Sequence, residues 1–163
     1  MIGATLQVEI TVRTIDQPAL LGKLMAITVS CGSEVLAASS YWDGKEMVVK
    51  LVTEDALRTT DALQAAGFDC KSDPVVLVEM PDKPGLPTLL SNKLARAGVN
   101  VLYTYLFRSD RQLTYLVFKT TDDIRAIYIL EVEALIHGLA AARNCQEPAS
   151  RDLAETGAIL HAA

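Results

Sequence analysis

One short segment of the sequence combines the groups needed to hold a small charged ligand. It reads Asp82-Lys83-Pro84-Gly85-Leu86 and opens a stretch of helical periodicity. The first N–H groups of a helix have no partner in the helix and carry partial positive charge, which favours a carboxylate. Gly85 lets a ligand approach the backbone closely, while the Asp82 carboxylate can receive an ammonium and Asn100 offers both a donor and an acceptor. A zwitterion needs this mixture of anion and cation recognition a few ångströms apart.

Each of these residues also has a plainer interpretation. Asp-x-Pro-Gly is good turn and helix-capping chemistry in its own right. For Asp82 alone we favour capping of the helix over ligand binding. For Gly85, a steric requirement of the turn and access for a ligand are both open, and for Asn100 a turn-to-strand role and a ligand role are both open. Only the combination of residues favours a binding site.

The segment is one half of an internal repeat. Asp16-Gln17-Pro18-Ala19-Leu20 lies 66 residues earlier (82 − 16) and aligns with it. The same offset aligns Val35 with Val101 and Leu51 with Val117, and no gap is needed. An ungapped match across a turn, a helix and two strands indicates two copies of one unit.

Apolar periodicity predicts the order β-α-β-β-α-β for the first copy, with strands at 6–13, 34–41, 46–53 and 68–71, a helix after Pro18 and another at 56–66. The second copy predicts strands at 75–80, 99–108 and 112–119, a helix at 85–97 and a last helix from 121 or 122 towards Arg143. No fourth strand is evident in the second copy. We therefore expect an α+β fold of two tandem βαββαβ ferredoxin-like modules with antiparallel sheets, at 1–72 and 73–143, and a C-terminal tail at 144–163.

The second copy resembles the ACT domain family. It has that family's Asp-x-Pro-Gly-x turn into a helix, followed by Ala97-Gly98-Val99-Asn100-Val101 at the start of the second strand. The first copy matches more loosely, and together the matches span residues 6–130. The resemblance implies a regulatory sensor, often of amino acids, whose domains pair side by side with ligands at the seam. Such domains usually accompany an enzyme, whereas this chain resembles the free-standing tandem type.

The turn chemistry and the resemblance together define a candidate ligand site. Its second-copy members are Asp82, Lys83, Gly85, Leu86, Asn100 and Val101, and a secondary set in the first copy is Asp16, Ala19, Leu20 and Glu34. Because Ala19 replaces the glycine and Glu34 replaces the asparagine, we expect the second copy to hold the better site and the first to be mainly structural. Tyr103 and Tyr105, two apart on one strand, are expected at an interface between the modules rather than in a pocket wall.

Composition argues against several other classes. The net charge of −5 disfavours a protein that binds nucleic acid through its phosphates. Neither a signal-peptide pattern nor an apolar stretch of membrane length is present, so we expect a cytoplasmic protein without membrane contact. The three cysteines show no CxxC spacing and are expected to be reduced thiols. His137 and His161 lack partners at metal-ligand spacing, and no phosphate loop or acid–base group is evident, so we expect no metal, cofactor or catalysis.

The expected function is therefore regulatory. The leading hypothesis is a protein that binds an amino acid and acts by ligand-dependent association of modules or subunits, with a homodimer and a partner enzyme as expected partners. The alternative is a ligand-free dimerisation or adaptor protein that regulates an enzyme by contact. Saturable binding of an amino acid separates the two hypotheses. Nucleic-acid binding ranks last, because the strands expected at 46–53 and 112–119 carry few aromatic or basic residues.

Overall fold

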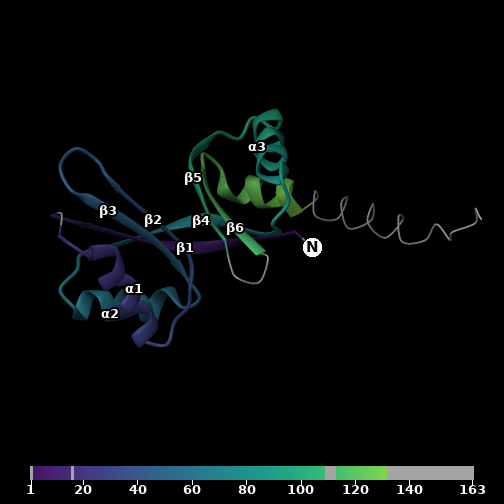
Figure 1. The fold of residues 1–163 in the computed structure, drawn as a ribbon. Coiled ribbons are helices and arrows are strands. Elements are labelled where there is room, and N and C mark those ends of the chain that lie inside the picture. The colour runs from purple at the N-terminus through teal and green to yellow at the C-terminus, as the bar shows by residue number, and fades with distance from the viewer. Residues whose placement is uncertain (1, 16, 109–112, 132–163) are drawn as a thin grey trace, which may run out of the picture.

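The computed structural model describes residues 2–15, 17–108 and 113–131 (Figure 1). Its elements are β1 (Gly3–Thr14), α1 (Leu20–Ser30), β2 (Val35–Trp42), β3 (Met47–Thr53), α2 (Ala56–Ala65), β4 (Cys70–Pro81), α3 (Leu86–Arg96), β5 (Val101–Arg108) and β6 (Leu113–Thr120). A further helical segment covers residues 123–131. The expected α+β order is confirmed to this point, whereas the expected helix end near Arg143 and the tail at 144–163 lie outside the described residues.

All six strands join in one antiparallel sheet. Their order is β2-β3-β1-β4-β6-β5. Strands β2-β3-β1-β4 with α1 and α2 form the expected βαββαβ pattern. The division into modules at 1–72 and 73–143 stays a prediction, and its boundary falls inside β4.

Strand β4 replaces two of the expected strands. Residues 68–71 and 75–80 were predicted as separate strands, but one strand runs from Cys70 to Pro81. Pro74 lies within it, opposite Val8 of β1. A proline lacks the N–H for a strand ladder, yet it is accommodated here because β6 pairs with β4 only from Val76 onward, which leaves that edge of β4 without a strand at Pro74 among the described residues.

The first residues of β1 supply a strand that the second half of the sequence lacks. Residues 3–7 of β1 pair with residues 75–79 of β4. The second half of the sheet therefore has the order β5-β6-β4-β1, which matches β2-β3-β1-β4 in the first half. The missing fourth strand of the second copy is thus provided by the N-terminal end of the chain.

The two helix pairs lie at opposite ends of the sheet (Figure 1). Because strand side chains alternate between faces, the even-numbered residues of β1 and β4 face the helices. Ile10 and Val12 pack with Leu24 of α1 in one core cluster. Val78 of β4 packs with Leu90 of α3 in a second cluster, which also receives residues from the 123–131 helix. Each fully buried aliphatic side chain of this kind stabilises the fold by about 1.5–3 kcal/mol. None of the helices in the described ranges has the length and apolar character needed to cross a membrane.

The other face curls so that edge strands β2 and β5 lie near each other. Inside the curl, the fully buried Glu9 of β1 accepts hydrogen bonds from Tyr103 Oη at 2.6 Å and from Tyr105 Oη at 2.8 Å, both from β5. Lys50 Nζ donates to the same carboxylate at 2.5 Å. The two tyrosines therefore join the two halves of the sheet, as expected of an internal interface, and Tyr103 also lines a pocket.

The second hairpin is one residue longer than the first, so the ungapped alignment is wrong beyond β5. In the first half Trp42 pairs with Met47, whereas in the second half Arg108 pairs with Thr114. Four residues separate the first pair (47 − 42 − 1) and five separate the second (114 − 108 − 1). The offset between β3 and β6 is therefore 67 residues (114 − 47), although it is 66 between β2 and β5.

This insertion changes which core residues are equivalent. Leu51 corresponds to Phe118 rather than to Val117 as the sequence alignment predicted. Leu51 and Phe118 are both fully buried on the helix-facing side of the sheet, whereas Val117 belongs to the cluster inside the curl. A shift of one residue moves a strand side chain to the opposite face, so burial confirms the corrected register.

Candidate ligand-binding site

The turn into α3 leaves the start of that helix open. Gly85 is the N-cap residue with φ +83°, in the left-handed region that favours glycine, and no side chain caps the helix. Pro87 occupies the first turn and has no N–H to satisfy. A side chain added at Gly85 would meet no protein atom within 4 Å. Glycine is therefore favoured by the backbone conformation, and the space beside it is free for a ligand.

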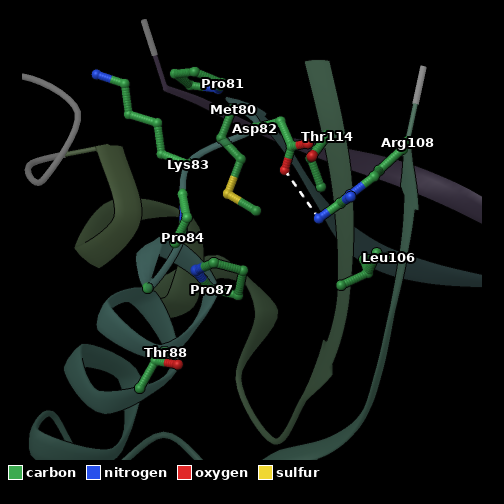
Figure 2. A pocket seen from close by; sticks show the side chains of 11 residues that line it. Met80, Pro81, Asp82, Lys83, Pro84, Pro87, Thr88, Leu106, Arg108 and Thr114 are labelled. Atoms are coloured by element: carbon green, nitrogen blue, oxygen red, sulfur yellow. Dashed lines mark ion pairs between the residues drawn. The ribbon is translucent and has the colours of Figure 1, made fainter. Parts of the chain in front are cut away.

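A pocket of about 420 Å³ adjoins this turn (Figure 2). Its walls come from the end of β4, the turn, the first residues of α3 and the facing ends of β5 and β6. Asp82, Lys83 and Gly85 from the predicted site line it. Ligand pockets of small molecules typically have volumes of about 300–1,000 Å³, so the space suits a metabolite of amino-acid size.

An exposed ion pair spans the pocket. The Arg108 guanidinium lies 3.2 Å from the Asp82 carboxylate, and their side chains are 68% and 39% exposed. Figure 2 draws Arg108 reaching across from β5 to Asp82. The preferred helix-capping role of Asp82 is wrong, because Gly85 is the N-cap and receives no side-chain hydrogen bond. Exposed ion pairs contribute only about 0–1 kcal/mol, so a ligand can compete for either partner.

Thr114 adds an unsatisfied hydroxyl to the same pocket. Thr114 is 3% exposed. Its Oγ1 atom is buried and has no hydrogen-bond partner in the described part of the chain. Leaving such a group unpaired costs about 1–3 kcal/mol. Thr114 pairs across the sheet with Met80 on one side and with Arg108 on the other. The hydroxyl therefore lies beside the ion pair, where a ligand could satisfy it.

Neither Arg108 nor Thr114 was predicted from the sequence to be a site residue. Thr114 occupies an inward position of β6, in alternation with Leu116 and Phe118, which are buried. A hydroxyl at a core-facing position of a strand is the signal that could have marked it.

The remaining second-copy residues lie elsewhere. Leu86 packs against the core cluster beneath α3, as does Val101 at the start of β5. Asn100 lies beyond the opposite end of α3, where its backbone N–H donates to Thr121 Oγ1 at 3.2 Å. The 11 residues of α3 span about 16 Å at 1.5 Å per residue. One chain therefore does not bring Asn100 to the pocket at Gly85.

The corresponding turn of the first copy has the same backbone but different surroundings. Ala19 is the N-cap of α1 with φ 62°, in the left-handed region, and again no side chain caps the helix. Leu20 is buried in the core cluster beneath α1 and α2. Glu34 is exposed, and its carbonyl accepts a backbone hydrogen bond from Glu54. Asp16 lies outside the described residues.

The hairpin ends explain why the two turns differ. By strand pairing, Trp42 and Met47 occupy the positions of Arg108 and Thr114. The guanidinium and hydroxyl of the second copy are thus replaced by two large apolar side chains. Of the two turns, only the second has a guanidinium and a buried hydroxyl at these two hairpin positions.

Other chemistry has little support in the structure. Among the described residues there is no group of three or more His, Cys, Asp or Glu side chains that could hold a metal ion. Cys31 and Cys70 are free thiols. Burial, aided by the charge of Asp69, raises the pKa of the Cys70 thiol, which disfavours the reactive thiolate.

Solved structures share this fold over most of the chain. A protein from Bacteroides thetaiotaomicron superposes with a TM-score of 0.69 at 16% identity, over 80% of this chain and 90% of its own. The ligand-free regulatory subunit of aspartate kinase from Thermus thermophilus gives 0.57 at 16% identity, over 79% and 95%. The corresponding subunit from Thermus flavus gives 0.54 at 17% identity, over 80% and 94%. No protein-family model and no curated protein matches the sequence.

The aspartate kinase regulatory subunits are ACT-domain proteins, so the resemblance deduced from the two turn motifs is confirmed at the level of the fold. The chain has the ACT-domain fold.

Proposed function

We propose that this chain is a regulatory protein that binds an amino acid at the turn into α3. The observation that carries the proposal is the unpaired Thr114 hydroxyl, buried beside the exposed Asp82–Arg108 ion pair at an uncapped helix start. Positive, negative and neutral polar groups converge there on one pocket. That is the mixture of groups that a zwitterion requires.

The groups suggest how the ligand would lie. Its ammonium would replace Arg108 as the partner of the Asp82 carboxylate and donate to Thr114 Oγ1. Its carboxylate would then take the released guanidinium, which can bind both oxygens at once, and would face the positive end of α3, where the Leu86 N–H already donates to Lys83 O at 3.3 Å. The ligand side chain would lie along Met80, Pro87 and Leu106, the apolar part of the lining.

Binding would act on the arrangement of chains. A ligand shifts a conformational equilibrium only by its difference in affinity between the two states. Asn100 and Val101 lie away from the pocket in one chain, and a homodimer that placed Asn100 of one copy near Gly85 of the other would bring the two predicted motifs together. The fold shared with a regulatory subunit of aspartate kinase agrees with control of a partner enzyme rather than with catalysis by this chain.

A second candidate function is a ligand-free adaptor. Leu102 and Leu106 on edge strand β5 are 60% and 51% exposed. Exposed apolar side chains on an unpaired strand edge favour contact with another protein. This alternative needs no ligand at α3.

Thermal unfolding in the presence of each of the twenty amino acids at millimolar concentration tests the proposal. A ligand that binds only the native state stabilises it by RT ln(1 + [L]/Kd), or about 2.7 kcal/mol at one hundred times Kd. A selective rise in the unfolding temperature that depends on concentration would support amino-acid binding. The absence of a shift with every amino acid would reject it and favour the adaptor.

A further inference from the structure

The pocket at α3 has a polar side and an apolar side. Asp82, Arg108 and Thr114 lie together on the polar side, where the ion pair crosses the pocket (Figure 2). Most of the remaining wall is apolar and consists of Met80, Pro81, Pro84, Gly85, Pro87 and Leu106. An amino acid held by its ammonium and carboxylate would direct its side chain along this apolar wall.

The charges of the pocket match the two charges that every amino acid carries on its backbone. Asp82 and Arg108 form one ion pair at 3.2 Å, which an ammonium and a carboxylate would convert into two. Lys83 is the other charged residue of the lining, but it is exposed, and Figure 2 shows its side chain directed away from Arg108 and Leu106. A charge on the ligand side chain would therefore lie beside apolar groups, where it has no partner.

The apolar wall combines rigid and adaptable side chains. Pro84 and Pro87 are rigid rings that flank Gly85 in the sequence. Met80 is 1% exposed, and its flexible thioether can adapt to the shape of a ligand. Leu106 is 51% exposed, so a ligand side chain that packs against it removes apolar surface of both partners from water. The wall therefore favours an apolar side chain.

Two threonine hydroxyls complete the lining. Thr114 lies beside the ion pair and belongs to the polar side, where the ligand ammonium would meet it. Thr88 follows Pro87 on α3 and is exposed, so its hydroxyl keeps access to water. Neither hydroxyl supplies a charge to the end of a ligand side chain.

We propose that the pocket at α3 selects amino acids with an apolar side chain, of which leucine and methionine are representative. This inference rests on the proposed binding of an amino acid at that pocket. Met80 and Leu106 contact the ligand side chain and set the preference, whereas Asp82 and Arg108 hold the groups that all amino acids share. Amino acids with a charged side chain bind more weakly because that charge has no partner. Glycine binds more weakly because it leaves the apolar wall exposed.

Titration calorimetry of the full chain with leucine, methionine, glycine, glutamate and lysine at neutral pH tests this selectivity. Leucine or methionine should bind at least about tenfold more tightly than the other three, because one methylene group in an apolar pocket can change affinity tenfold. Equally tight binding of glycine, glutamate or lysine would overturn the preference and leave amino-acid binding in place. Absence of binding by all five would also overturn it, and thermal unfolding with all twenty amino acids then shows whether amino-acid binding itself fails.

Two leucines of β5 provide matched variants. Leu106 lines the pocket at α3, whereas Leu102 lies on the same strand outside that pocket and is also exposed. We expect Leu106→Ala to weaken the binding of leucine by about fivefold and that of glycine by less than about twofold, with Leu102→Ala near the wild-type values. Unchanged affinity for leucine in Leu106→Ala, or equal weakening for leucine and glycine, would show that Leu106 does not contact the ligand side chain and overturn its assignment.

Discussion

The turns into α1 and α3 have nearly the same backbone, yet only the second has the groups to recognise a charged ligand. Ala19 and Gly85 both cap their helices in the left-handed region, with φ of 62° and 83°, and neither helix has a side-chain cap. The difference arises from the hairpin that faces each turn. Strand pairing places Trp42 with Met47 in the first half and Arg108 with Thr114 in the second.

The turn into α1 therefore has a structural role, whereas we propose that the turn into α3 also binds a ligand. The partial positive charge at a helix start favours an anion at both places. At α1, however, no guanidinium or buried hydroxyl occupies the two hairpin positions. A repeated motif therefore does not imply a repeated site, because the deciding residues come from strands distant in sequence.

The largest expected effect comes from filling the space beside each turn. Gly85→Val places a branched side chain at positive φ and into the open pocket, so amino-acid affinity should fall by about 100-fold, equivalent to about 2.7 kcal/mol. Ala19→Val introduces similar backbone strain at the other turn and should leave that affinity unchanged. Titration calorimetry on folded protein measures both. Loss of binding in Ala19→Val but not in Gly85→Val would reverse our assignment of the site.

The second prediction tests the contact that holds the two halves together. Burial, the negative charge of Glu9 and a hydrogen bond to it raise the pKa of Tyr105 above its usual value of 10.0. The folded state therefore retains this proton when the unfolded state loses it. The contribution of Tyr105 to the free energy of unfolding is fully present below pH 10. It is lost as pH rises above 10, by up to about 1.4 kcal/mol per pH unit.

Tyr105→Phe should therefore make stability less dependent on pH above 10. At neutral pH the same change should lower the free energy of unfolding by about 1 kcal/mol, because Glu9 loses a hydrogen bond. Urea denaturation of both proteins at a series of pH values measures this. An unchanged slope above pH 10 would mean that Tyr105 does not meet Glu9 in solution.

Thr114→Val should raise the stability of the ligand-free protein and lower its affinity for the amino acid. Valine has nearly the shape of threonine and removes a buried hydroxyl that has no partner. Without ligand, we expect the free energy of unfolding to rise by about 1 kcal/mol, while amino-acid affinity falls severalfold. Denaturation and calorimetry on the same variant give both values. A loss of stability in the ligand-free protein would indicate that the hydroxyl already has a partner.

The smallest expected effect concerns the backbone of the turns. A residue other than glycine at positive φ is strained, whereas glycine adopts that conformation freely but loses more entropy on folding. Ala19→Gly should therefore stabilise the protein by about 0.5 kcal/mol, and Gly85→Ala should destabilise it by a similar amount. Urea midpoints of the two variants measure this. A change of stability in the same direction in both variants would show that the two turns do not share a backbone conformation.

Local pattern was sufficient to predict most elements. Alternation in β1 and helical spacing in α1 and α3 are properties of adjacent residues, and the Pro84-Gly85 turn defines its own conformation. Pairing between distant segments was harder to predict from the sequence. The joining of two expected strands through Pro74 and the use of residues 3–7 as a fourth strand depend on contacts across about 70 residues (79 − 3 = 76 at the widest).

The candidate site was likewise predicted only in part. Asp82, Lys83 and Gly85 are neighbours in sequence and line one pocket. Arg108 and Thr114 reach that pocket only through the register of the second hairpin, which an added residue had shifted from the apparent repeat. Asn100 was placed with Gly85 by motif, but the length of α3 separates them.

The most direct test of the account is to give the second turn the hairpin ends of the first. The double variant Arg108→Trp/Thr114→Met would be titrated beside the wild-type protein with the amino acid that most raises the unfolding temperature. We predict that the variant folds, with an unchanged far-ultraviolet circular dichroism spectrum, and binds that amino acid at least about tenfold more weakly. Equal affinity in the two proteins would show that the ligand does not bind between Asp82, Arg108 and Thr114, which contradicts the central claim.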